Sequence, residues 1–289
     1  MNHDMDKVIG DFHEFYGLRE MPFALVPNTE YYVGLPDHNN CFNTLLFAVS
    51  TGEGFIKITG EVGTGKTLLC RRLLNSLKHN RYQTAYFPNP RLNPQELKRA
   101  LAKELGIADA LQMADNLLLD AIQDALIAFA RQGKKVLFIM DEAQALPLDS
   151  LEELRLFSNL ETEQQKLLQI ILFGQPELDD ILSRHEFRQL RQRISYAGHL
   201  HKLKPPMVLQ YIQHRMTLAG YNGEPLFDKA CVRLLHRATQ GVPRLLNIVC
   251  NKSLLIAYSE GRRRVLKRMV RKALEDTEGI EYRRHWLWG

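Results

Sequence analysis

The chain has 289 residues and a net charge of +5, and 45% of its residues are hydrophobic. This length suggests about two domains, and the composition supplies a substantial apolar core. Its apolar runs are shorter than the ~20 residues of a membrane span, and its N-terminus lacks the basic and apolar regions of a signal peptide. We therefore expect a cytoplasmic protein, with its four cysteines as buried thiols.

Strand and helix patterns alternate through the first two thirds of the chain. Apolar runs of strand length occur at 54–59, 135–140 and 167–173, and residues 82–87 also have a strand pattern. Helical patterns occur at about 65–78, 93–105, 114–131 and 148–163. Asn93, Pro94 and Glu96 have the spacing of a helix N-cap, N1 and N3. The alternation predicts a parallel sheet covered by helices on both faces.

The pattern changes at Lys204-Pro205-Pro206. Beyond this break only helical patterns occur, at about 207–219, 228–239, 242–259 and 265–278. We therefore predict an α/β domain over residues 1–203 and an all-helical domain over residues 204–289.

A glycine-rich segment follows the first strand pattern. Its sequence, Gly60-Glu61-Val62-Gly63-Thr64-Gly65-Lys66-Thr67, fits the P-loop pattern G-x-x-x-x-G-K-[ST]. In such a loop, backbone N–H groups and a helix N-terminus surround phosphate. Lys66 should reach the β- and γ-phosphates, and the hydroxyl of Thr67 should bind Mg²⁺. The loop and the adjoining Leu68 are thus predicted to bind ATP, and the α/β domain to be the nucleotide-binding domain.

An acidic pair, Asp141-Glu142, follows the strand pattern at 135–140. A carboxylate at the end of a buried strand can hold Mg²⁺, which makes Asp141 a metal candidate. Glu142 can act as the general base for an attacking water. Acidic residues at strand ends also serve as helix caps, but a P-loop in the same sheet favours the catalytic interpretation.

Two further polar residues stand where a hydrolysis site would use them. Gln175 ends the strand pattern at 167–173 and can contact the γ-phosphate or the water, or else cap the helix that begins at Pro176. Arg244 follows Gly241-Val242-Pro243 at a helix start, where it can contact phosphate or simply lie on the surface.

Together these motifs resemble those of AAA+ ATPases. Residues 60–67 match Walker A, and 136–142 match Walker B with its catalytic Glu. Gln175 stands at the sensor 1 position and Arg244 at the sensor 2 position. The resemblance implies a parallel five-stranded sheet between helices, a C-terminal helical lid, and a homo-oligomeric ring. It also implies an arginine finger, for which we favour Arg193, with Arg191 as the alternative; a basic helix face is the other interpretation of this segment.

Four segments narrow the resemblance to the ExeA/GspA family of secretion ATPases. They are Phe15–Phe23, Thr59–Thr67, Asp141–Gln144 and Gly174–Leu178, within a resemblance that runs from about 12 to 278. Members of that family continue into a membrane span and a peptidoglycan-binding domain. The end of this sequence at Gly289 favours the MshM-like branch, of type IV (MSHA-like) pilus biogenesis.

The family resemblance implies a function and partners. It predicts Mg²⁺-dependent ATP hydrolysis that energises or regulates assembly of a type IV pilus or type II secretion machinery. Pilus or secretion assembly proteins are the expected partners, with possible peripheral contact at the inner membrane. We expect the aromatic N-terminus, which includes Phe12, Phe15 and Tyr16, to pack in a core or at a sheet edge; the resemblance implies instead that it walls the adenine pocket with the helix that follows it.

A basic cluster between Arg262 and Lys272 supports an alternative function. Such a cluster can bind DNA phosphates, an acidic partner or anionic lipid, or can be a solvated helix face. The alternative is an ATP-switched DNA-binding protein of the transposition-helper or initiator type. The absence of a recognisable helix-turn-helix pattern makes DNA the less favoured partner. A third interpretation, a scaffold that binds nucleotide without hydrolysis, conflicts with the intact Glu142.

Overall fold

The computed structural model describes residues 2–163 and 165–280. The chain divides into two compact units. The sheet unit comprises residues 36–62 and 66–201. Of the described residues, the helical unit comprises 2–35, the loop segment 63–65, and 202–280.

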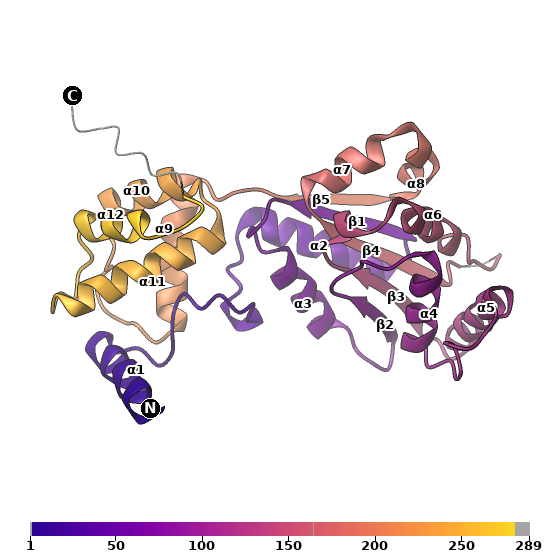
Figure 1. Ribbon diagram of the computed structural model, residues 1–289, viewed down its shortest axis with the longest axis horizontal. Helices are drawn as coiled ribbons and strands as arrows, with labels where there is room; N and C mark the ends of the chain where they lie inside the picture. The colour runs from indigo at the N-terminus through magenta and orange to yellow at the C-terminus, as the bar shows by residue number, and fades with distance from the viewer. Residues whose placement is uncertain (1, 164, 281–289) are drawn as a thin grey trace. The chain divides into compact units, whose positions relative to one another are not determined.

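The sheet unit contains five parallel strands in the order β2-β3-β4-β1-β5 (Figure 1). They are β1 (Phe55–Gly60), β2 (Tyr82–Phe87), β3 (Lys135–Met140), β4 (Leu168–Gly174) and β5 (Tyr196–Leu200). The predicted α/β fold with a parallel five-stranded sheet is confirmed. Four strands lie within one residue of the predicted runs. β5 was not located from the sequence, because this edge strand alternates exposed and partly buried residues instead of forming an apolar run.

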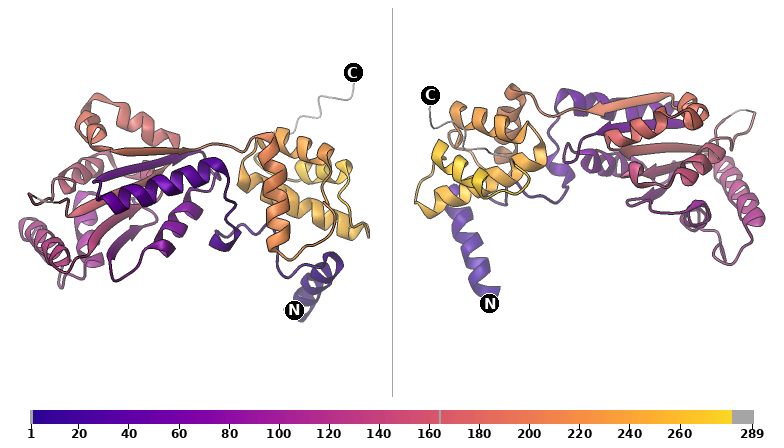
Figure 2. Two further views of the ribbon diagram at one scale, coloured as in Figure 1. Left: turned by 180° about the vertical axis from the view of Figure 1, so that it is seen from behind. Right: turned by 45° about the horizontal axis from the view of Figure 1, so that its top comes forward.

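Helices cover both faces of the sheet (Figures 1 and 2). One face carries α2 (Pro36–Thr51) and α3 (Lys66–Ser76). The other carries α4 (Pro94–Glu104), α5 (Asp115–Arg131), α6 (Leu148–Phe157), α7 (Pro176–Ser183) and α8 (Arg188–Arg193). Alternate residues of β3, such as Val136 and Phe138, join the core beneath this second set. The central strands are buried on both sides, as their continuous apolar runs predicted.

Local signals set the helix boundaries in this unit. α4 begins with the predicted capping box, in which the Glu96 N–H donates to Asn93 Oδ1 (2.9 Å) and the Asn93 N–H to Glu96 Oε2 (2.8 Å). The prediction of a helix from 148 to 163 was wrong in length. α6 ends at Phe157, because the chain turns there and pairs Glu161 with Lys166 in an antiparallel bridge before β4.

The helical unit contains α9 (Pro205–Leu218), α10 (Lys229–Thr239), α11 (Pro243–Ser259) and α12 (Lys267–Glu275). The N-terminal helix α1 (Asn2–Tyr16) belongs to the same unit. The rings of Phe12 and Phe15 pack edge-on against Tyr258 of α11, and the hydroxyl of Tyr16 donates to Leu254 O (2.9 Å). The aromatic N-terminus, which we predicted as part of the α/β domain, thus packs in the core of the helices. The boundary at residues 203 and 204 stays a prediction.

Three sequence expectations concern the chain as a whole. All four cysteines are buried and free, as predicted. Among residues 2–163 and 165–280, no helix has both the length and the apolar character that crossing a bilayer requires. The sequence at 282–288 mixes aromatic with basic residues, which suits a membrane interface, a partner groove or docking on the chain's own lid, and this segment lies outside the described residues.

Candidate functional site

The candidate site forms where three neighbouring strands end. β1 leads into the P-loop and α3, β3 into Asp141-Glu142, and β4 into Gln175. Because β3, β4 and β1 are adjacent and parallel, their carboxyl ends share one edge of the sheet. The topology therefore brings together three motifs that are far apart in the sequence.

The P-loop requires glycine at two of its positions. Gly63 has φ of +79° and Gly65 has φ of +107°, in the left-handed region that other residues rarely adopt. Thr64 between them is buried, while Glu61 and Val62 are exposed. Helix α3 then begins at Lys66, so its free N–H groups lie at the end of the loop, where an anion is stabilised.

Lys66 is a buried cation, with 4% of its surface exposed. Its ammonium donates to the loop carbonyls Gly60 O (2.8 Å) and Glu61 O (3.0 Å). Burial lowers the pKa of Lys66, while the carboxylates of Glu142 and Asp141 oppose this shift. The loop thus holds a cation that could exchange its carbonyl partners for phosphate oxygens.

Thr67 and Asp141 are in direct contact. The Thr67 hydroxyl donates a 2.7 Å hydrogen bond to Asp141 Oδ2, and Asp141 is 3% exposed. Burial raises the pKa of Asp141, and the hydrogen bond from Thr67 only partly offsets this rise. A hydroxyl and a carboxylate side by side are the hard oxygen donors that Mg²⁺ prefers, so this pair fits the expected metal. A cation between them would also compensate the buried carboxylate.

Glu142 is held by two amides. Gln144 Nε2 and Gln175 Nε2 donate to the same oxygen, Glu142 Oε2, at 2.6 and 2.9 Å. Burial alone would raise the pKa of Glu142, but these hydrogen bonds and the charge of Lys66 outweigh burial and lower it. The backbone of Glu142 is left-handed, with φ of 53° and ψ of 39°. An ionised carboxylate in a strained backbone is typical of functional sites.

Gln175 contributes to the site through its side chain. Its backbone occupies the N-cap position of α7, but its side chain makes no capping hydrogen bond and contacts Glu142 instead. The geometry therefore argues against the capping interpretation, and contact of Gln175 with the γ-phosphate or the water stays a prediction.

The two candidate arginines of α8 differ in their contacts. Arg193 is half-buried, and its Nη1 donates to Ser158 Oγ (3.1 Å) and Ser158 O (3.3 Å). Arg191 is exposed, and its Nη1 has one long bond to Ser183 O (3.5 Å). Of the two guanidinium groups, that of Arg191 therefore makes fewer and longer hydrogen bonds within its own chain.

Arg244 lies in the first turn of α11 with its side chain exposed. Its backbone N–H donates to Gly63 O (3.2 Å), and both residues belong to the helical unit. The contact joins the tip of the P-loop to the start of α11, and it uses the backbone rather than the guanidinium of Arg244.

Gln144 was not predicted as a site residue. Its only sequence signal was its place in the segment Asp141–Gln144, which had served for the family resemblance. In the structure its side chain makes two hydrogen bonds inside the site. Gln144 Nε2 donates to Glu142 Oε2, and Gln144 Oε1 accepts from the Gln175 N–H.

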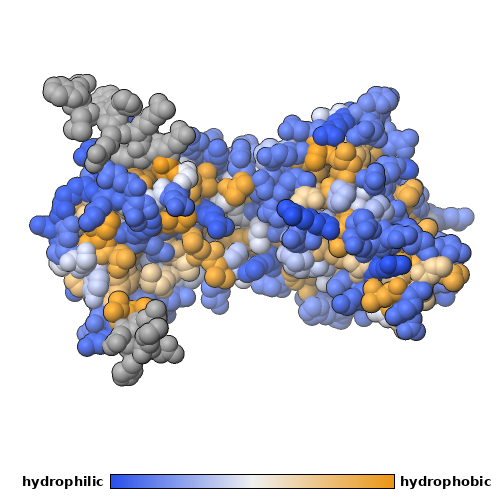
Figure 3. Space-filling model, in the orientation of Figure 1, coloured by the Kyte–Doolittle hydropathy of each residue, from blue (hydrophilic) through white to orange (hydrophobic). Residues whose placement is uncertain are grey.

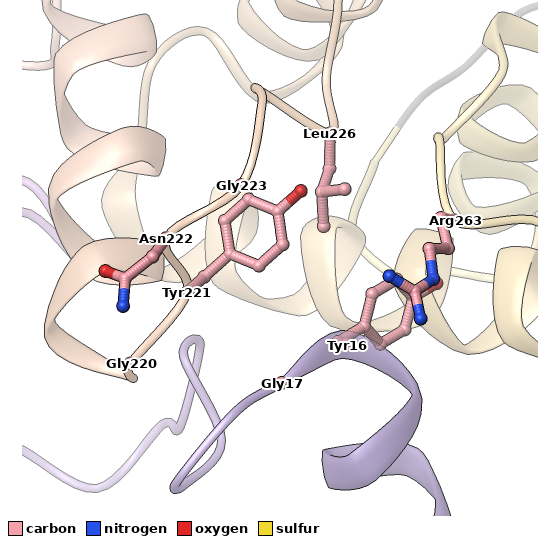
Figure 4. A pocket seen from close by; sticks show the side chains of 8 residues that line it. All are labelled: Tyr16, Gly17, Gly220, Tyr221, Asn222, Gly223, Leu226 and Arg263. Atoms are coloured by element: carbon pink, nitrogen blue, oxygen red, sulfur yellow. The ribbon is translucent and has the colours of Figure 1, made fainter.

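A separate cavity of about 250 Å³ lies in the helical unit (Figure 4). Tyr16, Tyr221 and Arg263 line it, together with the turn at Gly17 and the loop that ends at Leu226. No residue of the P-loop, of the acidic pair or of the predicted sensor and finger positions lines this cavity. It forms where the end of α1 meets the loop between α9 and α10.

Comparison with known proteins agrees with this geometry. Residues 49–182, which span β1, the P-loop, β3 and β4, match the family model described as AAA domain. The chain carries an AAA domain. Over 278 residues, 96% of its length, it is 37% identical to General secretion pathway protein A of Aeromonas hydrophila, of which it covers 50%. The resemblance to the ExeA/GspA family is thereby confirmed.

A second curated relative shares a smaller part of the chain. The DNA transposition protein B of the Mu-like prophage FluMu, from Haemophilus influenzae, is 28% identical over 168 residues, which are 56% of this chain and 54% of that protein. The chain thus spans about half the length of the curated relatives it matches. Among solved structures, Cdc6p from Pyrobaculum aerophilum matches with a TM-score of 0.66 at 17% identity, covering 88% of this chain and 70% of that one, which supports the fold.

Proposed function

We propose that this AAA-domain protein binds Mg²⁺-ATP at residues 60–68 and hydrolyses it with Glu142 as the general base. The hydrogen bond between Thr67 and Asp141 is the observation that carries the proposal. It joins the P-loop to the acidic strand end in the arrangement that Mg²⁺-dependent phosphoryl transfer requires. The two amide hydrogen bonds to Glu142 support its role as an ionised base.

Each loop residue has a defined part in this proposal. The N–H groups between Gly60 and Thr67 bind the phosphates, and Lys66 neutralises the β- and γ-phosphate charge. Thr67 and Asp141 would hold Mg²⁺. When bound, the ion supplies charge neutralisation at the phosphate oxygens. Gln175 orients the γ-phosphate or the water, and Arg244 contacts phosphate from the helical lid.

Hydrolysis then needs one proton transfer by the chain itself. The oxygen of a water molecule forms a bond to the γ-phosphorus while the bond from that phosphorus to the β–γ bridging oxygen breaks. Glu142 accepts the proton that the water loses. Although burial alone would raise the pKa of Glu142, its hydrogen bonds and the charge of Lys66 lower it, so the carboxylate is ionised at neutral pH and can accept this proton.

The decisive experiment separates binding from turnover. Glu142→Gln keeps the shape of the site but removes the base, so ATP should bind with nearly unchanged affinity while turnover falls at least about 100-fold. Lys66→Ala serves as the binding-deficient control. Normal turnover by Glu142→Gln would remove Glu142 from the mechanism. A wild-type protein with no affinity for Mg²⁺-ATP would refute the proposal altogether.

The biological role we propose is to energise or regulate the assembly of a secretion or pilus machine. The relative named General secretion pathway protein A, 37% identical to this chain, supports type II secretion. A type IV (MSHA-like) pilus and the MshM-like branch stay predictions. We further propose that the protein acts as a homo-oligomeric ring in the cytoplasm, with peripheral contact at the inner membrane. ATPase assays with and without purified secretion or pilus assembly proteins test this role, because a true partner should stimulate turnover.

A second function has its own support. The cations Arg262, Arg263, Lys267, Arg271 and Lys272 are all exposed, and the part of the helical unit around α10 and α12 is largely hydrophilic on the face shown in Figure 3. One curated relative is named as a DNA transposition protein. If these cations bind DNA, affinity should fall steeply with salt. No binding to duplex DNA at ~50 mM salt would exclude this function.

A further inference from the structure

A single side chain, that of Gln144, connects the ends of β3 and β4. Its Nε2 donates to Glu142 Oε2 (2.6 Å), and its Oε1 accepts from the backbone N–H of Gln175 (2.9 Å). The side chain of Gln175 donates to the same Glu142 oxygen (2.9 Å). The three residues therefore form a closed ring of hydrogen bonds across two adjacent strands.

The chain packs closely beside this ring. A Cβ atom on Gly174 would lie 2.6 Å from Leu178 Cδ2, so a side chain there would displace Leu178, whereas Gln144 Oε1, 3.4 Å away, would be in ordinary van der Waals contact. Gln144 itself lies in the short 3₁₀ turn Ala143–Ala145, whose Ala143 is fully buried. The amide of Gln144 is therefore held in place from both strands.

The ring also determines which Glu142 oxygen is available. Both amides bind Oε2, and Oε1 accepts no hydrogen bond from any residue in the described part of the chain. The left-handed backbone of Glu142 is a conformation that persists only where neighbouring contacts enforce it. Gln144 supplies one such contact, to the Glu142 carboxylate, and is itself held by the Gln175 N–H at the end of β4.

We infer that Gln144 is a positioning residue, which ties Glu142 to the Gln175 backbone and leaves Glu142 Oε1 as the acceptor of the proton from the attacking water. This inference rests on the proposed ATP hydrolysis and names how its base is oriented. Gln144 is not expected to touch the nucleotide. Its loss should therefore reduce turnover without weakening nucleotide binding.

Two substitutions separate the two hydrogen bonds of Gln144. Gln144→Leu has a similar volume but loses both the donor to Glu142 and the acceptor for the Gln175 N–H. Gln144→Glu keeps the acceptor but sets a second carboxylate beside Glu142, so repulsion or a shared proton perturbs the base. Gln123, exposed on α5, offers matched controls in Gln123→Leu and Gln123→Glu.

Steady-state ATPase assays and nucleotide-binding titrations test the inference. Both Gln144 variants should lower kcat about tenfold or more, while KM and the nucleotide Kd stay within about twofold of wild type. The Gln123 variants should match wild type. In a Glu142→Gln background, adding Gln144→Leu should cause no further loss, because Gln144 acts through Glu142. A kcat within twofold of wild type, or an equal loss in both backgrounds, would overturn the inference.

Hydrogen exchange on the nucleotide-free protein gives an independent measurement. The amide of Gln175 should exchange about fivefold faster in Gln144→Leu than in wild type, and at the wild-type rate in Gln144→Glu. Unchanged exchange in Gln144→Leu would show that the bridge does not form in solution. If the wild type binds no ATP, the proposed function fails. If it turns over normally and the Gln144 variants do too, only this inference fails.

Discussion

The hydroxyl of Thr67 donates a 2.7 Å hydrogen bond to Oδ2 of Asp141, although the two residues are 74 positions apart in the chain. Thr67 lies in the first turn of α3, which follows β1, and Asp141 follows β3, with β4 between these two strands in the sheet. The bond is the direct physical link between the two halves of the proposed nucleotide site.

Removal of that hydroxyl should uncouple the two halves. Thr67→Ala leaves the buried Asp141 without its donor and removes one proposed Mg²⁺ ligand, so ATP turnover should fall at least about 100-fold. Thr67→Ser keeps the hydroxyl and should retain most of the activity. Mg²⁺-dependent nucleotide binding, measured by titration, should weaken in Thr67→Ala alone. Equal activity of the two variants would contradict the role of the hydroxyl.

The arginine pair of α8 gives a prediction about a shared site. Arg191 is exposed, and Arg193 is bonded to Ser158. If Arg191 reaches a neighbouring subunit, Arg191→Ala should lose at least about tenfold in turnover, and mixing it with Lys66→Ala should restore part of the activity. Arg193→Ala should instead lower the free energy of unfolding by about 1 kcal/mol. If mixing Lys66→Ala with Arg193→Ala restored turnover, and mixing it with Arg191→Ala did not, the arginine finger would be Arg193.

The N-cap of α10 allows a test of stability against pH. Asp228 Oδ1 accepts from the Cys231 N–H (2.7 Å), and this bond holds the pKa of Asp228 below its usual range. Its contribution to stability is therefore present above the unfolded pKa of ~4 and is lost as pH falls through the folded value. Asp228→Ala should cost about 1 kcal/mol at neutral pH, and Asp228→Asn much less. Denaturant unfolding at pH 7 and pH 3 measures both, and the cost of Asp228→Ala should shrink at pH 3.

A pair of glycines separates backbone strain from steric conflict. Gly241 and Gly261 both have positive φ, of +75° and +65°. A Cβ on Gly241 would lie 2.0 Å from Leu203 O, whereas a Cβ on Gly261 meets nothing within 4 Å. Gly261→Ala should cost about 1 kcal/mol of unfolding free energy, and Gly241→Ala at least about 3 kcal/mol. Thermal unfolding measures both losses of unfolding free energy. If they are equal, the backbone at Leu203 moves enough to accommodate the added methyl group.

Much of the fold was predictable because its signals are local. The apolar runs of β3 and β4 and the capping box at Asn93 depend on neighbouring residues alone, and the structure confirms them. β5 has no such run, since its edge position leaves residues such as Ala197 exposed. The motif residues of the site were recognisable from spacing, but Gln144 was not, because its bond to the Gln175 N–H exists only once β3 and β4 pair.

The packing of the first 35 residues on the helical unit sets an order of events during synthesis. The sheet unit is complete once Leu200 has emerged from the ribosome, because all five strands lie before that point. Phe12, Tyr16 and Phe23, although made first, have no core to enter until α9 to α12 follow. About 250 residues separate Phe23 from the end of α12, so at typical elongation rates these rings stay open to chaperones and to one another for on the order of 13–50 s.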